Sequence, residues 1–309
     1  MTNYLVEPAP HIKSKVTTQK IMLHVIIAML PAAGASTYIY GLRALLMIVV
    51  CSAACVVSEL VFEKITKRPR TISDLSAVVT GMLLAFNLPP TLPFYMAIIG
   101  SVIAIVAVKQ FFGGIGQNFA NPAITARIIL MLSFTSYMTT WVQPFYYTMT
   151  ADAVSAATPL VSEEKFELLD LLFVKSGCIG ECCNAALLLG GLYLIVMRII
   201  NPVTPIAYIG TVALLTWASG GDVTLQVLSG GLILGSFFMA TDYATTPIRT
   251  SGKLIFAVGC GLLTFVIRSF GSMPEGVSYS ILIMNILTPY IDKLTVSHPF
   301  GAKKEEKKS

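Results

Sequence analysis

Strongly hydrophobic stretches of about 15 to 20 residues recur along this chain and alternate with short polar segments. An α-helix needs about 20 apolar residues to cross a hydrocarbon core that is about 30 Å thick. The pattern predicts ten membrane-spanning helices, at 21–40, 43–62, 74–88, 93–108, 121–140, 184–200, 203–219, 223–240, 253–268 and 276–291. The predicted fold class is therefore an all-α polytopic membrane protein without a large extramembrane domain.

Composition supports this class. Of the 309 residues, 55% are hydrophobic and only 12% are charged, whereas soluble domains contain about 25% charged residues. The net charge of +5 says little about nucleic acid, because it reflects lysines and arginines placed on one side of a membrane, and no nucleic-acid partner is expected. Residues 1–20 are polar and basic and show no cleavable signal, so the first helix is expected to direct insertion itself.

The distribution of cations predicts the orientation. With the N-terminus inside, nearly all of the 21 lysines and arginines lie on the cytoplasmic side; the exceptions are Arg43, Lys165, Lys175 and Arg268. Ten helices return the C-terminus to the inside. The predicted organisation is a cytoplasmic tail, a first membrane half of five helices, an external loop, a second half of five helices and a basic cytoplasmic tail, at 1–20, 21–141, 142–183, 184–293 and 294–309.

The two halves resemble each other weakly. The stretch 109–113 (KQFFG) precedes the fifth helix, and 268–271 (RSFG) precedes the tenth. An odd number of helices in each repeat makes the halves inverted in the membrane, an arrangement that commonly builds a central site. The third helix is short and ends at Pro89 and Pro90, which fits either a broken helix or an ordinary helix stopped by proline.

Several cofactor classes lack ligands here. His11, His24 and His298 lie at or beyond the predicted helix ends, so no pair of histidines is available to bind haem in the membrane. No Gly-x-Gly-x-x-Gly motif follows a strand, which argues against a dinucleotide fold. Three clustered cysteines, Cys178, Cys182 and Cys183, fall short of a four-thiolate set, so no metal site is predicted.

Acidic residues near the inner helix ends have two interpretations. Glu59, Glu63 and Asp74 are expected to pair with neighbouring cations, Lys64, Lys67 and Arg68. Asp242 either organises an interfacial turn before Pro247, which we favour, or lies on an ion path.

Four separated motifs resemble the family that contains the D subunit of Rnf complexes and the B subunit of the sodium-pumping NADH:quinone oxidoreductase. They are FGGIGQNFANPA at 112–123, TGMLLAFNLPPT at 80–91, MATD at 239–242, and PEGV at 274–277 with MNILTP at 284–289. The motifs occur in order and cover residues from about 20 to 293, and the short loops favour the Rnf type.

The resemblance implies a covalent flavin. In that family FMN is joined through its phosphate to a threonine in a Ser/Thr-Gly-Ala-Thr pattern, and the matching residues here are Ser155, Ala156, Ala157 and Thr158. Thr158 is therefore the implied attachment residue, and Ala156 stands where the family usually has glycine. The family's Gly-x-x-Gly-Glu stretch implies that Gly180 and Glu181 contribute to the flavin site. External Lys165, Lys175 and Arg268 are candidate donors to the phosphate.

The implied function is electron relay within an Rnf-type ferredoxin:NAD oxidoreductase, coupled to sodium or proton translocation across a bacterial or archaeal cytoplasmic membrane. The flavin loop would lie on the outer face. Implied partners are a second FMN-carrying subunit, iron-sulfur subunits and the lipid bilayer; whether the central cavity also takes riboflavin is left open. Two alternatives are a channel or transporter for a small polar solute and a structural anchor without cofactor, because fold alone does not decide function.

Overall fold

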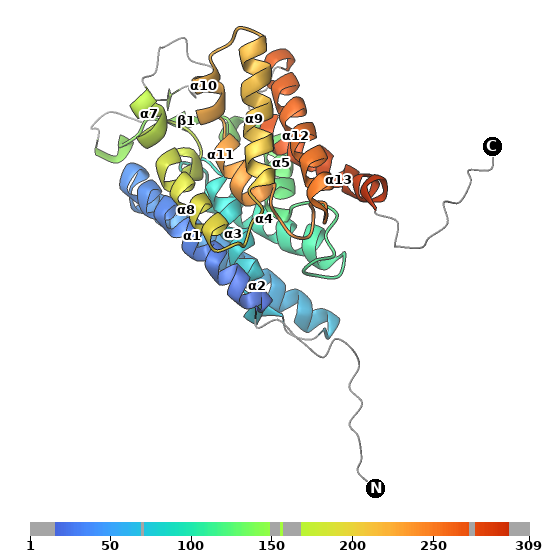
Figure 1. Ribbon diagram of the computed structural model, residues 1–309. Helices are drawn as coiled ribbons and strands as arrows, with labels where there is room; N and C mark the ends of the chain where they lie inside the picture. The colour runs from blue at the N-terminus through green and yellow to red at the C-terminus, as the bar shows by residue number, and fades with distance from the viewer. Residues whose placement is uncertain (1–15, 69–70, 149–154, 157–167, 272–275, 297–309) are drawn as a thin grey trace, which may run out of the picture.

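A computed structural model describes residues 16–68, 71–148, 155–156, 168–271 and 276–296, and helices dominate it. In Figure 1, α1 and α2 lie along one side of the molecule, whereas α9, α12 and α13 lie along the other, with α3 and α11 between them. The long helices are α1 (Thr18–Tyr40), α2 (Leu42–Thr66), α12 (Thr250–Phe270) and α13 (Gly276–Thr295).

Three of these helices, α1, α2 and α12, are long and apolar enough to cross a membrane by length and composition. The Thr17 hydroxyl caps α1 by accepting a hydrogen bond from Lys20 N at 3.3 Å. Gly41 then separates α1 from α2 with φ at 77°, a conformation that glycine adopts at little cost. The chain can therefore reverse direction within one residue.

Shorter helices occupy the other predicted segments. They are α3 (Ser76–Phe86), α4 (Phe94–Val102) continuing into the π-helical η2 (Ile103–Gln110), α5 (Pro122–Ser133) followed by α6 (Thr135–Met138), α8 (Asn184–Val196) and α9 (Val203–Ala218). A helix is thus found in each of these predicted stretches. The predicted fifth helix is two pieces, because α5 ends at Ser133 and α6 begins at Thr135.

The predicted eighth helix, 223–240, is not continuous, which corrects the sequence-based expectation. It consists of α10 (Val223–Leu228), α11 (Leu232–Leu234) and the π-helical η5 (Gly235–Met239). Gly230 and Gly231 have φ values of 63° and 70°, so the backbone turns between α10 and α11. Apolar residues flank Ser229, Gly230 and Gly231 on both sides and keep the segment hydrophobic on average, which is why hydropathy alone did not reveal the break.

Glycines set the closest helix contacts. A Cβ at Gly81 in α3 would lie 2.5 Å from the Cα of Ser52 in α2. A Cβ at Gly190 in α8 would lie 2.0 Å from the carbonyl oxygen of Ala28 in α1. The α1–α8 contact joins the two halves of the sequence, and both helix pairs pack backbone to backbone, as membrane helices commonly do at small residues.

The segment between α6 and α8 contains the small elements of the fold. Trp141–Val142 (β1) pairs antiparallel with Ser155–Ala156 (β2), with Trp141 opposite Ala156. Three further elements are η3 (Tyr146–Thr148), α7 (Leu168–Phe173) and η4 (Ile179–Glu181), and η1 (Ile72–Asp74) precedes α3. Residues 178–183 are buried inside the helix bundle, where Ile179 N donates to Leu88 O at 3.0 Å.

Candidate functional site

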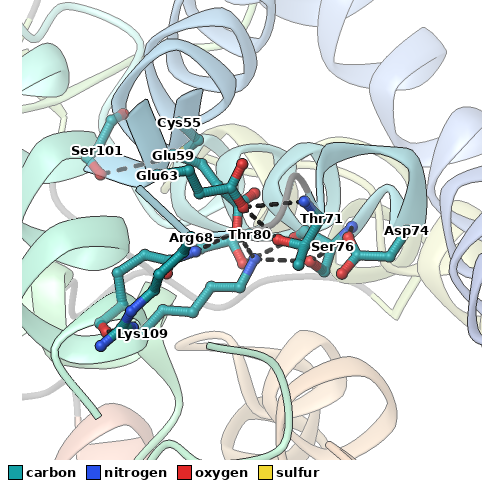
Figure 2. A network of polar contacts seen from close by, with 11 residues as sticks. Cys55, Glu59, Glu63, Arg68, Thr71, Asp74, Ser76, Thr80, Ser101 and Lys109 are labelled. Carbon is teal, nitrogen blue, oxygen red and sulfur yellow. Dashed lines mark hydrogen bonds and ion pairs between the residues drawn. The ribbon is translucent and has the colours of Figure 1, made fainter. Parts of the chain in front are cut away.

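A buried ion pair links α2 to η2. Lys109 Nζ lies 2.6 Å from Glu59 Oε1, and the side chains are 3% and 0% exposed. Gln110 Nε2 donates to the same carboxylate oxygen at 2.6 Å, and Lys109 also donates to Ser76 Oγ at 2.6 Å. Figure 2 shows the lysine reaching across to α2 and α3. Lys109 thereby joins η2 to α2 and to the start of α3.

The polar network extends from this pair toward the loop after α2. Ser76 donates its hydroxyl and its backbone N–H to Asp74 Oδ1, at 2.6 and 2.8 Å. Glu63, one turn beyond Glu59, accepts from the backbone N–H and hydroxyl of Thr71. The Oε2 atoms of Glu59 and Glu63 are buried and have no hydrogen-bond partner among the described residues. A buried oxygen atom without a hydrogen-bond donor costs free energy, and each of the two carboxylates has one oxygen that is free to accept a further hydrogen bond.

These contacts correct the predicted pairing of the inner acids. Glu59 pairs with Lys109, fifty residues away, and in the described part of the chain this is the one ion pair found. Lys64 and Lys67 are exposed, while Arg68 donates to the carbonyl of Gln110 at 3.0 Å. Glu59 and Glu63 are thus buried, and among the described residues neither of them forms an ion pair with Lys64, Lys67 or Arg68.

Lys109 and Ser76 also line a cavity. The cavity has a volume of about 90 Å³, and its polar lining includes Asn118, Thr241 and Asp242. It adjoins a wider cavity of about 640 Å³, and both share Gly116, Asp242 and Tyr243 as lining residues. Lys109 thus borders a passage that is lined mostly by apolar side chains and by a few polar ones, and that runs between the start of α1, the glycine-rich loop after η2 and the turn after η5.

Asp242 organises the turn before Pro247, the role that the sequence favours, and a place on an ion path stays a prediction. Its Oδ2 accepts from the Thr245 hydroxyl at 3.1 Å, and its carbonyl accepts from the Thr246 hydroxyl at 2.6 Å, which organises the turn before Pro247. The half-buried side chain also borders both cavities. Burial raises the pKa of Asp242, whereas the hydrogen bond from Thr245 opposes that rise.

Arg127 occupies a second buried cluster, and its position corrects the expected place at the inner edge. The residue is 4% exposed, and its guanidinium donates to Asn87 Oδ1 at 2.8 Å, Ser278 Oγ at 3.1 Å and Cys178 Sγ at 3.4 Å. The Cys178 thiol in turn donates to Asn87 O at 3.3 Å. One arginine therefore connects α5 with the end of α3, the start of α13 and the buried segment before α8.

The residues of the predicted flavin site fall into two groups. Ser155 and Ala156 form β2, whereas Ala157 and Thr158 lie outside the described residues. Gly180 and Glu181 are buried in η4. A Cβ at Gly180 would lie 2.5 Å from Phe86 Cβ, so this glycine allows η4 to pack against the end of α3, away from the inner cavity.

The predicted phosphate donors are turned inward where the structure describes them. Lys175 is 4% exposed and donates to the carbonyl of Leu228. Arg268 donates to the carbonyls of Ser229 and Gly230, at 2.9 and 3.1 Å. Lys165 lies outside the described residues. Both described cations thus bind the break between α10 and α11.

His24 and the cysteines have local hydrogen bonds. His24 lies within α1, not at its end as predicted, and its Nδ1 is 2.7 Å from the hydroxyl of Tyr193 in α8. All six cysteines are buried and reduced, and Cys182 Sγ donates to Ile179 O at 3.2 Å. Within the described ranges, no three His, Cys, Asp or Glu side chains are grouped as metal ligands.

Comparison with known proteins identifies the scaffold. The model of the NQR2, RnfD, RnfE family matches residues 5–301, nearly the whole chain. The chain belongs to this family. The match includes the helices on both sides of residues 142–183, the buried ion pair and the segment before α8, so the family assignment concerns nearly the whole chain.

Individual relatives align from end to end. The chain is 45% identical to the D subunit of the Na(+)-translocating ferredoxin:NAD(+) oxidoreductase complex of Acetobacterium woodii, over 99% of this chain and 98% of the relative. It is 42% identical to the D subunit of the proton-translocating ferredoxin:NAD(+) oxidoreductase complex of Clostridium ljungdahlii, over 97% of both. It is 37% identical to the D subunit of the ion-translocating oxidoreductase complex of Stutzerimonas stutzeri, over 92% of both.

Sequence reasoning missed the roles of Lys109, Gln110 and Arg127. Each lies within or beside a strongly apolar stretch, and an ionisable residue such as Lys109 or Arg127 in such a stretch is itself a signal of a buried partner or a functional site. Counting the lysine and the arginine only as markers of membrane orientation concealed that signal.

Proposed function

We propose that this chain is the D subunit of an Rnf-type ferredoxin:NAD oxidoreductase complex, where it relays electrons and contributes to sodium or proton translocation. The supporting observation is the end-to-end match: the family covers residues 5–301, and relatives named for this role align over more than nine-tenths of both chains. A full-length match at 45% identity implies the same membrane scaffold, not a shared fragment.

The proposed topology has ten crossings in two inverted halves, with both termini in the cytoplasm of a bacterium or archaeon. The occurrence of helices in the ten predicted hydrophobic segments supports it. Several of them are short or interrupted, as between α10 and α11. Irregular backbone at membrane depth is tolerated where protein surrounds it, and Ser229 at this break is fully buried.

FMN on Thr158 is the proposed cofactor, attached through its phosphate on the outer face. Support comes from the β1–β2 pair, which fixes Ser155 and Ala156 opposite Val142 and Trp141. Phe145, Tyr146 and Tyr147 follow β1, and such rings offer flat surfaces on which an isoalloxazine can stack. FMN would supply the capacity to accept and donate one or two electrons. Gly180 and Glu181 would hold the inner end of the same loop in place.

For ion translocation we propose the inner passage beside Lys109 and Glu59. A charge buried within the membrane is costly, so the Glu59 carboxylate, which has an unused oxygen and pairs with the cavity-lining Lys109, is a suitable position for a proton or cation. The wider cavity of about 640 Å³ lies within the usual range of small-molecule sites, about 300–1,000 Å³. We propose it as the place for a riboflavin.

The test uses inverted membrane vesicles from a host whose chromosomal copy is deleted and replaced by a plasmid copy. Reduced ferredoxin and NAD⁺ should drive cation uptake with the wild-type chain and not with the empty plasmid. Abolition of uptake by a sodium ionophore or by a protonophore would distinguish the two ions. Full ferredoxin-dependent NAD⁺ reduction without the chain would contradict the proposal, and cation flux without electron donors would favour the channel.

A further inference from the structure

A small cavity lies where two helices begin. α9 and α12 lie side by side in Figure 1, and they pack closely, because a Cβ at Gly261 in α12 would lie 2.6 Å from Thr211 Cβ in α9. The cavity has a volume of about 160 Å³, and its lining includes Asn201 just before α9, Thr204 in the first turn of α9 and Lys253 in the first turn of α12. The two helices therefore present their N-terminal ends to the same space.

The electrostatics of this space favour an anion. The N–H groups in the first turn of a helix lack partners within the helix, and they form the positive end of its dipole. Neither α9 nor α12 has an acidic residue in its first turn, and α12 has Lys253 there instead. Among the described residues, no carboxylate forms an ion pair with this lysine. Because a lysine at this end of a helix is repelled by the dipole, an anion in the cavity would stabilise both.

Thr204 provides a buried hydrogen-bond donor to the cavity. Its side chain is 2% exposed, and its hydroxyl makes no hydrogen bond to another described residue. By contrast, the hydroxyl of Thr211, two turns further along α9, donates to Ala207 O at 2.7 Å. Asn201 Oδ1 accepts from Val203 N at 3.0 Å, so the Nδ2 group of Asn201 is left to donate elsewhere. A buried hydroxyl without a partner costs free energy, so Thr204 points to a ligand that accepts hydrogen bonds.

Acidic side chains lie outside this cavity. Asp242 and Asp292 line the wider cavity of about 640 Å³, and Asp292 accepts from Ile248 N at 3.2 Å. Neither of them borders the smaller cavity, where Lys253 is the one charged residue among the described lining residues. This lining does not suit a cation. It suits a phosphate group, which carries a negative charge and several oxygen atoms that accept hydrogen bonds from lysine, hydroxyl and helix N-terminal N–H groups.

Exposed apolar side chains beside the cavity indicate where such a phosphate comes from. Ile248 lines the cavity and is 85% exposed, and Ile206 in α9 and Leu254 in α12 are 66% and 48% exposed. On the proposed topology both helices begin at the cytoplasmic face of the membrane, where lipid headgroups and the first part of the acyl chains lie. A phospholipid brings a phosphate group and acyl chains together in one ligand.

We propose that the cavity between the starts of α9 and α12 binds a phosphate group, with an anionic phospholipid of the inner leaflet as the expected source. Lys253 and the two helix ends supply the positive charge, and Thr204 and Asn201 supply hydrogen-bond donors. The Glu59–Lys109 pair does not border this cavity, and the phosphate site does not depend on the flavin. The location of the site on the inner leaflet rests on the topology proposed above, whereas electron transfer plays no part in it.

The experiment measures the binding of phosphatidylglycerol to the full-length chain in non-ionic detergent by native mass spectrometry. The wild type should bind this lipid more tightly than dioleoylglycerol, which has the same acyl chains but no phosphate. Lys253→Met should weaken the binding of phosphatidylglycerol about tenfold, and Thr204→Val should weaken it several-fold, whereas Lys253→Arg should keep most of it. Two matched controls, Lys64→Met at an exposed lysine of α2 and Thr211→Val at a hydroxyl bonded within α9, should bind as the wild type.

A second arm adds sodium phosphate at millimolar concentration. Displacement of the lipid by phosphate, sensitive to Lys253→Met and Thr204→Val, would support the site with free phosphate as its ligand, and retention of the lipid would support the phospholipid. Unchanged binding of phosphatidylglycerol in both variants would overturn the proposal. Equal binding of phosphatidylglycerol and dioleoylglycerol by the wild type would overturn it as well, even if a variant failed to fold. None of these measurements uses an electron donor, so a negative result is distinguishable from a failure of the proposed function.

Discussion

The most direct test of the buried polar contacts is to remove one member of the Glu59–Lys109 ion pair. In Lys109→Met, the Glu59 carboxylate keeps Gln110 as a donor but loses the one positive charge that contacts it within the described residues. Ser76 loses the same donor. Because both charged side chains are almost fully buried, solvent cannot replace the lost interaction. Removing one partner of a buried pair typically costs about 3–5 kcal/mol.

The expected size of the effect is measurable. At about 2 °C per kcal/mol for a chain of this size, Lys109→Met should lower the apparent Tm by about 6–10 °C. Glu59→Gln leaves the ammonium without its carboxylate and should cost a similar amount. The double variant Glu59→Leu/Lys109→Met removes both charges and should recover most of the loss, since apolar replacements of a buried pair are often nearly neutral.

The assay is a double-mutant cycle on the purified chain in one detergent, with apparent Tm read by differential scanning fluorimetry and checked by size-exclusion chromatography after heating. The control is Lys64→Met, which removes an exposed lysine from α2 and should change Tm by no more than about 1 °C. Additive losses in the double variant would refute the reasoning, because they would mean that the two side chains act independently.

Two further predictions concern packing and pH. Gly190→Ala should lower the apparent Tm by about 2–6 °C, because its Cβ would lie 2.0 Å from Ala28 O. The control is Gly210→Ala in α9, whose Cβ meets nothing within 4 Å, so this change should be neutral or slightly stabilising. Equal effects of the two changes in thermal scans would contradict the described packing of α8 against α1. Stability should rise from pH 8 to 10.5, because the folded state binds fewer protons than the unfolded state where burial lowers the pKa of Lys175 to about 8. Thermal scans of Lys175→Met should lack this rise, and an unchanged rise would assign it to another group.

The hydrophobic pattern was sufficient to place the helices. Runs such as 43–62 and 253–268 coincide with α2 and α12 because burial in lipid requires continuous apolar sequence. The break at Gly230 was not predicted, since the apolar residues on both sides keep the segment hydrophobic on average while its backbone turns. The turn depends on cations from α12 and from the segment before α8, and contacts between distant residues leave no local pattern.

The sequence indicated which kinds of residue the site contains, but not which of these residues contact one another. An ionisable residue in an apolar stretch indicates a buried partner, but the sequence does not tell which one, and Glu59 was assigned to neighbours when its partner is fifty residues away. Residues 175–183 are polar or small and therefore resembled an exposed loop. Their burial follows from hydrogen bonds to the ends of α3 and α10, at Leu88 and Leu228, which only the folded structure brings together.

The most direct test of the proposed relay is mass spectrometry of the peptide that contains Thr158, from protein purified from its native host. The expected result is a mass increase equal to FMN minus water, located on Thr158 by fragmentation and absent in Thr158→Ala, together with flavin fluorescence of the denatured chain. An unmodified Thr158 in protein from a complex that is active in ferredoxin-dependent NAD⁺ reduction would contradict the covalent-flavin relay.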